Sequence, residues 1–594
     1  MPLEAFRGYT GESMNSDGKP LIVQGDGSLL LDVHDAAFEA ARGEISAYAE
    51  LEKSPEHVHT YRISPLSLWN AAGAGWEASK IASSLEGWSR YPVPPNVVTQ
   101  VQDILDRWGK IRLIPCEKQP DFPVLSESSE TEKNEGEEPA ATDSDLFLFM
   151  AVDDTAISEE LKARKALSKW LIPTQGGFWV RLVHRGTVKA ELIRIGFPVV
   201  DLIPLRDGEP LEVNLRENTA DGSAFTVRDY QQDAVSAFAG TGEPGTGFGT
   251  VVMPCGSGKT VVGIAAMARV KRRTLVLTTN VAAVHQWRAE ILDKTDLSPD
   301  DIAEYSGDRK DVGPVTVATY QILTWRKGKN GPYPHFDLFR KHDWGLIVYD
   351  EVHLLPAPVF RVTAEIQAVR RLGLTATLVR EDGAERDVFS LVGPKRFDVP
   401  WKELEASGWI AEARCREVRV ALPKEDRIPY AMADKRRKVR LAAENSRKID
   451  IAMQLVKNRH EDQILVIGQY ISQLENIASR LNVPIITGKT PNAEREVIYG
   501  KFRRGEERVI VVSKVANFAI DLPDASVAIQ LSGSYGSRQE EAQRLGRILR
   551  PKKRDSWFYS LVSRGTVEED FAANRQRFLT EQGYRYTIDI WEDE

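Results

Sequence analysis

Cysteine is scarce in this 594-residue chain, where Cys116, Cys255 and Cys415 lie far apart and are odd in number. Such spacing supports neither a disulfide framework nor a zinc cluster, and it fits a reducing compartment. Apolar stretches long enough to span a membrane are missing as well, and residues 1–19 lack the apolar centre of a secretion signal. We therefore expect a cytoplasmic protein.

Positive charge is in slight deficit, because 78 lysines and arginines face 86 acidic residues and leave a net charge of -8. The deficit is concentrated in 126–145, where eight acidic residues accompany one lysine, Lys133. This segment has no aromatic residue and cannot bury enough apolar surface to offset chain entropy. Residues 123–146 are thus predicted to form a disordered acidic linker, and the nearly neutral remainder leaves room for a basic groove that binds nucleic acid.

A glycine-rich phosphate-binding signal is present at 253–260, although Met253 stands where the general pattern has glycine. An apolar, β-branched run at 248–254 precedes it and a helical pattern at 261–270 follows, so the loop lies between a strand and a helix N-terminus, where phosphate is stabilised. Lys259 is expected to reach the β- and γ-phosphates and Thr260 to bind Mg²⁺. The nucleotide-binding residues predicted in this loop are Pro254, Cys255, Gly256, Ser257, Gly258, Lys259 and Thr260.

Two adjacent carboxylates, Asp350 and Glu351, end a buried strand pattern at 345–349. Ligands of open α/β sheets bind at the carboxyl ends of the strands. Asp350 is therefore predicted to hold the metal, and Glu351 to orient or deprotonate the attacking water. Without the preceding loop, the same pair would more often belong to a solvated turn.

An arginine cluster occupies 543–550, where Arg547 and Arg550 are three residues apart and share one face of a predicted helix. An arginine beside the γ-phosphoryl group offsets negative charge that develops during hydrolysis. We predict catalytic roles for Arg547 and Arg550, and Gln543 offers an amide to water or phosphate. Without the other two motifs, this helix would more simply be a solvated surface.

Two sets of strand patterns alternate with helical patterns, which predicts an α/β fold with two doubly wound parallel-sheet domains. Only the first set contains the phosphate loop and only the second contains the arginine cluster, so one ATP bound between them is the simplest arrangement. The strands of the first set are predicted at 250–253, 274–278, 315–318, 346–349 and 372–375. Those of the second set are predicted at 464–467, 484–486, 509–512, 527–530 and 557–561.

Further modules precede these domains. Residues 1–122 are predicted to form an N-terminal α/β accessory domain, in which three helices and a strand at 110–115 resemble a winged helix. Residues 147–220 are predicted to form a β-rich module with strands at 178–184, 190–195 and 199–203. The two sheet domains are assigned to 221–396 and 397–594.

Small polar residues end one predicted strand in each sheet, at Thr319 and at Ser513 followed by Lys514. Residues of this kind suit contact with a sugar-phosphate backbone without reading the bases. Trp287, which follows another strand, is interpreted as a core residue.

The motifs together resemble those of superfamily 2 helicases, and specifically the XPB-type DNA helicases. The residues that carry the resemblance are 254–259, Asp350-Glu351-Val352-His353, 373–382 and 543–550, and the likeness is close over roughly 225–580. Residues 57–115 are similar to the N-terminal region of bacterial XPB-like proteins. Met253 looks normal for this family.

The resemblance implies two RecA-like domains, 3′→5′ translocation, duplex opening and a role in DNA repair. It places Arg228 and Gln231 at the adenine, adds Asp521 to the nucleotide site, and matches Arg380-Glu381-Asp382 to an element implicated in strand separation. Thr375 and Thr377 fall in the motif that would couple the nucleotide to DNA. Residues 422–447 match a shortened thumb, and 170–215 stands where the family has its damage-recognition domain.

The sequence is therefore interpreted as an ATP- and Mg²⁺-dependent, DNA-stimulated helicase that acts as a monomer on single-stranded DNA and duplex junctions. One alternative is a translocase that moves along duplex DNA without separating the strands. A second alternative is an ATP-gated binding module that holds DNA and recruits a nuclease or repair partner.

Overall fold

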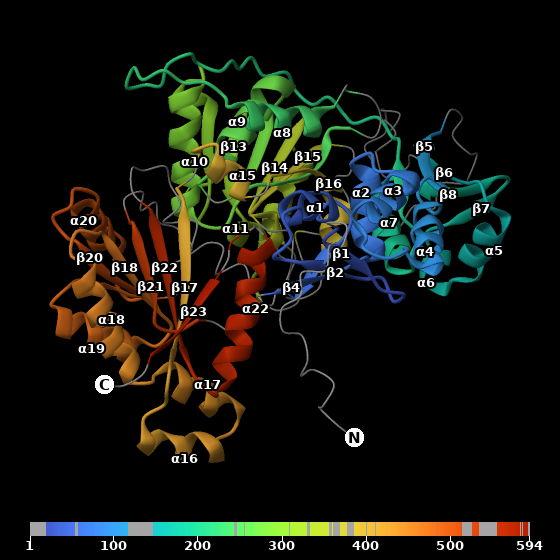
Figure 1. Ribbon diagram of the computed structural model, residues 1–594. Helices are drawn as coiled ribbons and strands as arrows, with labels where there is room; N and C mark the ends of the chain where they lie inside the picture. Colours follow the sequence, from blue (N-terminus) through green and yellow to red (C-terminus); the bar gives the residue numbers. More distant parts are fainter. Residues whose placement is uncertain are drawn as a thin grey trace. The chain divides into compact units, whose positions relative to one another are not determined.

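The computed structural model divides the chain into two compact units, Met1–Asp106 and Arg107–Glu594 (Figure 1). Each unit is described by itself. The described residues are 19–53, 57–116, 147–240, 242, 246–254, 256–307, 309–328, 333–355, 359, 369–376, 385–399, 401–409, 411–513, 525–533, 555–581, 584 and 586–591. The predicted linker at 123–146 lies outside them.

The N-terminal unit contains a four-stranded antiparallel sheet and four helices. Its strands, in the order β1-β2-β4-β3, are β1 (Leu21–Val23), β2 (Ser28–Asp32), β3 (Glu50–Lys53) and β4 (Val58–Arg62). Its helices are α1 (Phe38–Ile45), α2 (Pro65–Gly73), α3 (Ala78–Trp88) and α4 (Pro95–Leu105). Ser64 caps α2 by accepting from the Ser67 backbone N–H, and Pro65 follows at the first helical position, which explains why the helix begins there.

The predicted winged-helix arrangement is wrong in its order of elements. The three expected helices are present as α2, α3 and α4, but four strands precede them. The strand expected at 110–115 is β5 (Ile111–Pro115), which pairs with strands of the following module. The accessory domain consequently ends near Asp106 and not at residue 122.

The module that follows has a five-stranded sheet in the order β7-β8-β6-β5-β9. Its other strands are β6 (Phe147–Val152), β7 (Ile172–Thr174), β8 (Gly177–Arg181) and β9 (Val199–Asp201), and its helices are α5 (Thr155–Ala163), α6 (Lys165–Ser168) and α7 (Arg185–Arg194). The strand predicted at 190–195 is wrong, because these residues belong mainly to α7. Val188 and Leu192, four residues apart, are both buried and give α7 its apolar face.

Three charged side chains of this module form a buried cluster. The Asp201 carboxylate accepts from Arg185 Nη2 at 2.7 Å and from Lys189 Nζ at 2.8 Å. Burial alone would raise the pKa of Asp201, but the two cations hold it below its ordinary value. Burial lowers the pKa of Lys189 to about 8, against the opposing effect of Asp201. The cluster ties α7 to the end of β9.

Asp201→Ala is expected to lower the free energy of unfolding by about 3–5 kcal/mol, because it leaves two buried cations without their carboxylate. Asp153→Ala is the matched control, since its partner Arg112 and Asp153 itself are largely exposed, and it should cost less than about 1 kcal/mol. Urea unfolding of the full chain, followed by circular dichroism, measures both values. Equal effects of the two substitutions would contradict the structural role of the cluster.

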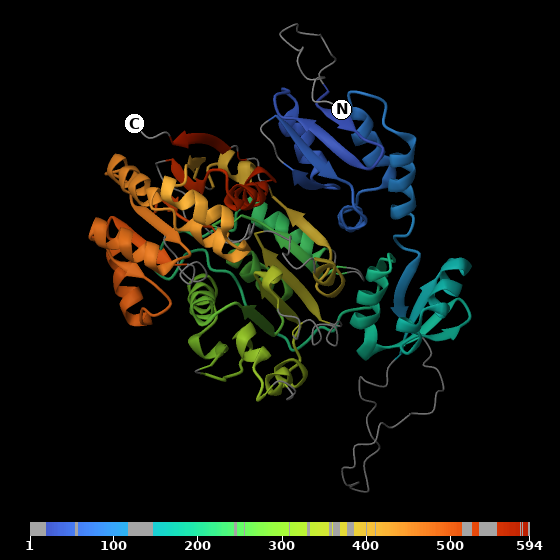
Figure 2. The same cartoon turned by 90° about the horizontal axis from the view of Figure 1, so that it is seen from below.

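The first large sheet has seven parallel strands in the order β12-β13-β11-β14-β15-β10-β16 (Figures 1 and 2). All five predicted strands are confirmed. The strands are β10 (Phe248–Val252), β11 (Thr274–Thr278), β12 (Ile302–Tyr305), β13 (Val315–Thr319), β14 (Leu346–Asp350), β15 (Arg370–Thr375) and β16 (Lys395–Asp398). The helices of this domain are α8 (Asp229–Ala239), α9 (Lys259–Val270), α10 (Val281–Lys294), α11 (Tyr320–Thr324), α12 (Asp337–Arg340) and α14 (Glu385–Leu391).

Both faces of this sheet are buried. In β11, Leu275 and Leu277 belong to one apolar cluster, whereas Val276 between them belongs to another. Because successive side chains of a strand point to opposite faces, a strand covered on both sides must be apolar at every position. That requirement explains the continuous apolar runs in the sequence.

The second large sheet is also entirely parallel, with the order β19-β20-β18-β21-β22-β17-β23. Its strands are β17 (Ala413–Val420), β18 (Ile464–Gly468), β19 (Ile485–Ile486), β20 (Val509–Ser513), β21 (Val527–Gln530), β22 (Ser556–Ser563) and β23 (Tyr586–Trp591). Its helices are α15 (Trp401–Ala406), α16 (Lys424–Met432), α17 (Lys435–Ala443), α18 (Arg447–Asn458), α19 (Ile471–Leu481), α20 (Asn492–Arg503) and α22 (Val567–Glu581). The five strands predicted for this sheet are confirmed.

The two sheets have the same topology. When the strands of each are numbered from its own first strand, both orders read 3-4-2-5-6-1-7. The domain boundary predicted at residue 396 needs a small correction, because β16 continues to Asp398 and pairs with β10 of the first sheet. The chain thus contains two topologically equivalent α/β domains.

Candidate nucleotide site

The phosphate loop joins β10 to α9, as predicted. The Met253 backbone N–H donates to the Thr375 carbonyl at 2.9 Å, which fixes the start of the loop to the end of β15. Gly256 and Gly258 have φ values of 81° and 85°, a conformation that L side chains rarely adopt. The Ser257 hydroxyl donates to the Pro254 carbonyl at 2.7 Å, so the loop is closed on itself before α9 begins at Lys259.

The segment 228–231 supports this loop from the start of α8. Tyr230 Oη and Gln231 Nε2 donate to the Ser257 carbonyl at 2.8 and 2.9 Å. Gln231 Oε1 accepts from the Arg228 backbone N–H at 3.0 Å. The Arg228 guanidinium lies over the Trp409 ring at 4.3 Å from its centroid. The two residues predicted to bind adenine are thus next to the loop, and Tyr230 is a contact that the sequence did not single out.

Gly258→Ala is expected to lower ATP affinity by at least about tenfold, or ~1.4 kcal/mol. A Cβ atom at this position would collide with Gln231 Nε2, in addition to the strain of a positive φ. Gly505→Ala is the matched control, because Gly505 has a φ of 73° but a Cβ atom there would have no neighbour within 4 Å. Titration with a fluorescent ATP analogue distinguishes the two variants, and equal affinities would show that the contact with Gln231 does not shape the site.

Asp350 and Glu351 lie at the carboxyl end of β14, beside the loop. Lys259 Nζ is 3.7 Å from Glu351 Oε1, and both side chains are mostly buried. Trp287 Nε1 donates to Asp350 Oδ2 at 2.9 Å, and Tyr320 Oη donates to the Asp350 carbonyl at 2.9 Å. Trp287 is a core residue, as expected, but it also orients the carboxylate that is predicted to hold the metal.

The two carboxylates place excess negative charge in a buried site. Burial, and then the neighbouring charge of Glu351, raise the pKa of Asp350 to about 6. A divalent cation beside Asp350 would offset this repulsion, and the Thr260 hydroxyl on the first turn of α9 supplies a second oxygen of the kind that Mg²⁺ prefers. The residues therefore fit Mg²⁺ by their chemistry.

His353 links Glu351 to the end of the neighbouring strand. Its Nδ1 lies 3.5 Å from Glu351 Oε2 and 2.7 Å from Thr375 Oγ1. Glu351 itself has a φ of 49°, which is unusual for a residue other than glycine. Sequence reasoning assigned no separate role to His353, although its place in the motif could have indicated one.

The three described residues predicted to contact DNA or couple to it are at the carboxyl ends of strands, as expected. Thr319 ends β13, and its hydroxyl accepts from the Ile322 N–H at the start of α11. Thr375 ends β15 and Ser513 ends β20. All three side chains are buried here, so contact with a DNA backbone stays a prediction.

Several predicted site residues lie outside the described residues. They are Cys255, Thr377, Arg380, Glu381, Asp382, Lys514, Asp521, Gln543, Arg547 and Arg550. The site as described is therefore the part contributed by the first sheet domain.

The second sheet has no phosphate loop at the equivalent position. Its first strand, β17, is followed by Ala421, Leu422 and Pro423 before α16 begins, and none of these is a glycine that could turn backbone N–H groups toward phosphate. Among the described residues, a glycine-rich loop between the first strand and the following helix therefore occurs in the first sheet domain and not in the second.

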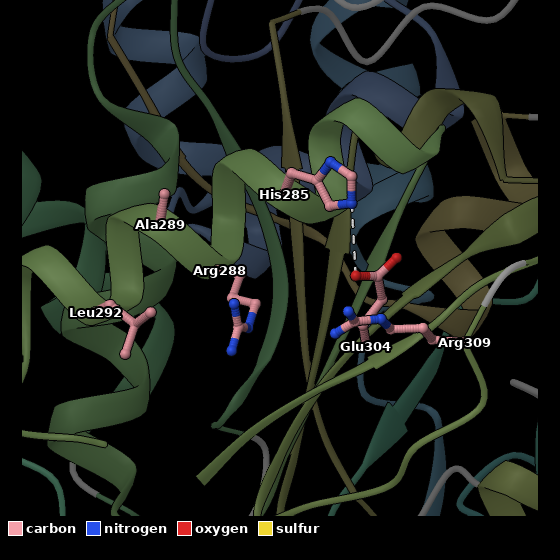
Figure 3. Close-up of a pocket in the computed structure, with 6 residues that line it drawn as sticks. All are labelled: His285, Arg288, Ala289, Leu292, Glu304 and Arg309. Carbon is pink, nitrogen blue, oxygen red and sulfur yellow. Dashed lines mark ion pairs between the residues drawn. The ribbon is translucent and has the colours of Figure 1, made fainter. Parts of the chain in front are cut away.

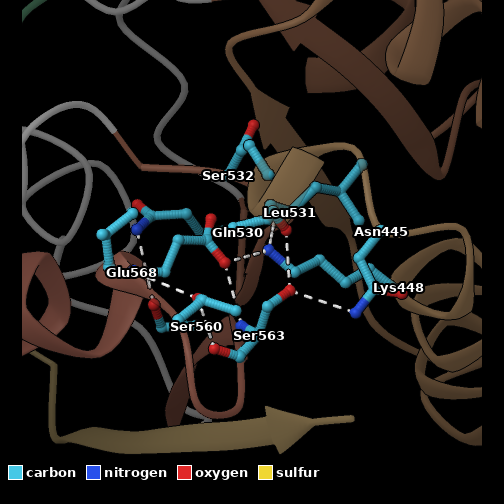
Figure 4. A network of polar contacts seen from close by, with 12 residues as sticks. Asn445, Lys448, Gln530, Leu531, Ser532, Ser560, Ser563 and Glu568 are labelled. Atoms are coloured by element: carbon cyan, nitrogen blue, oxygen red, sulfur yellow. Dashed lines mark hydrogen bonds and ion pairs between the residues drawn. The ribbon is translucent and has the colours of Figure 1, made fainter. Parts of the chain in front are cut away.

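A buried polar network stands at the ends of β21 and β22 (Figure 4). Lys448 Nζ donates to the Leu531 carbonyl at 3.1 Å and to Glu568 Oε2 at 2.6 Å. The Ser563 backbone N–H donates to the same carboxylate oxygen at 2.9 Å. The network fixes the end of β21, which precedes the segment 534–554 that carries the arginine cluster.

A separate cavity of about 400 Å³ lies between α10 and the edge strand β12 (Figure 3). It is lined by His285, Arg288, Ala289, Leu292, Glu304 and Arg309. His285 Nε2 is 3.5 Å from Glu304 Oε2, and the Ser306 hydroxyl donates to the other oxygen of this carboxylate. The cavity is distinct from the phosphate loop.

Neither a membrane-spanning helix nor a metal cluster occurs in the part of the chain that the structure describes. No helix there combines the length and apolar character needed to cross a bilayer. Groups of three or more His, Cys, Asp or Glu side chains arranged to hold a metal are likewise not found among these residues.

Comparison with known proteins identifies three matching regions. Residues 404–591 match the ERCC3/RAD25/XPB C-terminal helicase family, 224–380 match the family of the type III restriction enzyme res subunit, and 21–130 match a helicase conserved C-terminal domain. These regions fall in both sheet domains and in the N-terminal part of the chain.

Similar proteins span nearly the whole chain. A "DNA 3'-5' helicase XPB" of Kineococcus radiotolerans is 48% identical over 96% of this chain and 96% of its own length. The protein of the same name from Mycobacterium tuberculosis is 46% identical over 96% of this chain and 98% of its own length. A "General transcription and DNA repair factor IIH helicase/translocase subunit XPB" of Encephalitozoon cuniculi is 32% identical, covering 97% of this chain and 84% of its own length.

Proposed function

Because this chain belongs to the XPB family of DNA 3′–5′ helicases, we propose that it is an ATP-dependent helicase that separates or remodels duplex DNA in the 3′→5′ direction. The observation that carries the proposal is the constellation of Lys259, Asp350 and Glu351 beside a phosphate loop. Its setting in two α/β domains of identical topology is the arrangement expected of a nucleotide-driven motor.

The residues of the first domain would divide the chemistry as follows. Lys259 neutralises charge on the β- and γ-phosphates, and the backbone N–H groups at the start of α9 bind phosphate oxygens. Glu351 holds the attacking water and accepts its proton. Since His353 lies within hydrogen-bonding distance of Thr375 and 3.5 Å from Glu351, a shift of the β15 end would move a ring that lies beside the Glu351 carboxylate.

Mg²⁺ would be held by Thr260 and Asp350, where it supplies charge neutralisation for the transferred phosphoryl group. Trp287 keeps the Asp350 carboxylate turned toward the site. Arg228 and Gln231 lie where an adenine-binding segment is expected. Gln231 contacts the Ser257 carbonyl of the loop and Arg228 donates to Tyr230, which contacts the same carbonyl, so a bound adenine would be coupled to the phosphate loop. Asp521 is proposed as a further nucleotide contact.

The second domain would complete hydrolysis through Gln543, Arg547 and Arg550. An arginine supplied by a facing domain stabilises the charge of the transition state and makes hydrolysis depend on closure. We propose that DNA bound across both domains favours that closed state. Thr319, Thr375, Thr377, Ser513 and Lys514 would contact or sense the DNA, and Arg380-Glu381-Asp382 would act at the strand junction.

The expected partners are DNA, with single strands and duplex junctions as substrates, and a nuclease or other repair protein. Relatives from eukaryotes are named as subunits of a transcription and DNA repair factor, which supports a role in DNA repair here. A duplex translocase without strand separation, and an ATP-gated module that recruits a nuclease, are the two alternatives.

Three assays run side by side test the proposal: ATP hydrolysis with and without DNA, displacement of a strand from a forked duplex, and displacement of the third strand from a triplex. A helicase shows DNA-stimulated hydrolysis and opens the fork. Triplex displacement without fork opening identifies a duplex translocase. ATP-dependent DNA binding with neither displacement activity identifies a binding module.

A further inference from the structure

An exposed tryptophan lies at the end of α11 in the first sheet domain. Trp325 is 53% exposed and follows directly after α11, whose Tyr320 and Leu323 are buried. Because Thr319 caps this short helix, the tryptophan is held six residues from the end of β13 by a rigid element. Exposure of a single apolar residue does not by itself indicate a binding site. The side chains around Trp325 therefore carry the argument.

The Trp325 ring is supported on one side by other rings. Its centroid is 5.9 Å from that of His335, with the planes inclined by 61°. His335 Nδ1 is in turn 2.8 Å from Tyr305 Oη on the edge strand β12. Burial, and then the charge of Lys310, lower the pKa of His335, so the ring is neutral at pH 7. The His335 ring that contacts Trp325 is therefore uncharged and is held in place by Tyr305.

A second set of rings anchors the same segment to the core. The Arg326 guanidinium lies 5.2 Å from the Tyr333 centroid, and Tyr333 stacks on Phe336 at 4.7 Å. Phe336 contacts Phe339, which is buried in the apolar core of the domain. The segment after α11 thus holds its tryptophan in place even though the ring is half exposed.

Exposed cations surround these rings. Arg326 and Lys327 follow Trp325 directly, and Arg309 and Lys310 lie in the turn after β12, where Lys310 pairs with Tyr305. Asp311 is an exposed acidic neighbour in the same turn, and the sequence has a further aspartate, Asp308, outside the described residues. Arg309 also lines the cavity of Figure 3, together with Arg288 and His285. The cavity that Arg309 lines also contains the carboxylate of Glu304, so the exposed cations nearest Trp325 in the sequence, Arg326 and Lys327, are the first candidates for phosphate contact.

We propose that Trp325 is a stacking platform for an unpaired base of a DNA strand, and that Arg326, Lys327 and Arg309 contact the phosphates beside it. An aromatic face flanked by cations is the combination by which proteins hold single strands without reading their sequence. The proposal rests on the proposed function, because it names a contact of the same DNA substrate. It adds a site outside the helicase motifs.

The test is equilibrium binding of the full-length protein to a labelled oligothymidine and to the same oligonucleotide with abasic sites. Trp325→Ala should weaken binding to the oligothymidine by about 5- to 100-fold, the range of aromatic stacking on a base. It should leave binding to the abasic strand unchanged. Trp325→Phe should recover most of the affinity, because a phenyl ring still offers a stacking face.

Salt dependence separates stacking from charge. Trp325→Ala should leave the slope of log K against log[salt] unchanged, whereas Arg326→Ala should reduce it by about one phosphate contact. Tyr91→Ala is the control, since Tyr91 is an aromatic residue of similar exposure, 60%, in the N-terminal unit. It should bind both strands as the unaltered protein does.

The proposal would be overturned if Trp325→Ala lost equal affinity for the two oligonucleotides, or if it lost affinity for neither. A thermal unfolding scan of Trp325→Ala confirms that the variant is folded. DNA-stimulated ATP hydrolysis of the unaltered protein is measured in the same buffer. If that stimulation is present while Trp325→Ala binds normally, only the stacking site is wrong, and if the stimulation is missing, the proposed function itself fails.

Discussion

Lys259→Ala and Glu351→Gln are each expected to reduce ATP turnover to background, for different reasons. Lys259→Ala removes the cation that stabilises phosphate charge, so ATP affinity should fall as well. Glu351→Gln keeps the shape of the side chain but removes the carboxylate that accepts a proton from water. This variant should bind ATP with nearly normal affinity and remain on DNA in a closed complex.

Lys271→Ala is the matched control for the lysine variant. Lys271 lies just after α9, at the opposite end from Lys259, and contacts Asn214 and Glu212 at a partly exposed position. It should hydrolyse ATP at the unaltered rate. Near-normal hydrolysis by Lys259→Ala or by Glu351→Gln would show that the assigned cleft is not the catalytic one.

Arg547→Ala is expected to lower DNA-stimulated turnover by roughly 10³ or more, the scale of an arginine that stabilises the phosphoryl transition state. ATP affinity should stay within several-fold of the unaltered value, because the nucleotide is bound mainly by the first domain. The isolated first domain should likewise bind nucleotide, hydrolyse it poorly and show no response to DNA. Quenched time courses of phosphate release, with and without DNA, measure these rates.

Arg504→Ala provides a control arginine of the same domain, since Arg504 is largely exposed and forms an ion pair with its near neighbour Glu506. Its turnover should be unchanged. If the isolated first domain instead hydrolyses ATP at the full-length, DNA-stimulated rate, the two-domain mechanism is wrong and the arginine cluster is an ordinary surface.

In the two large sheets, the strands predicted from the sequence are mostly those buried on both faces, and the short edge strand β19 is the exception. The runs 274–278 and 509–512 are apolar or β-branched throughout, which is typical of a strand covered on both faces. β12, β16 and β23, which lie at sheet edges, were missed because solvent on one side allows charged or polar residues to interrupt the pattern. β17 was missed because Arg414, Arg416 and Arg419 break its run.

Predictions from the local sequence were also wrong where contacts between distant residues determine the structure. Residues 190–195 contain four apolar residues that suggested a strand, but most of them belong to α7, whose buried face includes Val188. The strand at 111–115 looked like the end of the N-terminal domain, and its partners are β6 and β9, which lie more than 30 residues further along the chain. Strand partners are long-range contacts and leave no local signal.

For the site, the sequence identified the groups that carry charge and missed those that position them. Phosphate loops and adjacent carboxylates have fixed spacings because neighbouring residues do the chemistry. Trp287 and Asp350 are 63 residues apart, and Tyr230 is 27 residues from the carbonyl that it supports. Only the folded chain shows that these side chains meet.

The direction of strand displacement decides whether this protein is a 3′→5′ helicase. A duplex with a 3′ single-stranded tail and one with a 5′ tail are incubated separately with the protein, ATP and Mg²⁺, with Glu351→Gln as the inactive control. We expect the unaltered protein to displace the strand from the 3′-tailed duplex only, and the control to displace neither. Displacement of the 5′-tailed duplex alone, or equal displacement by Glu351→Gln, would contradict this expectation.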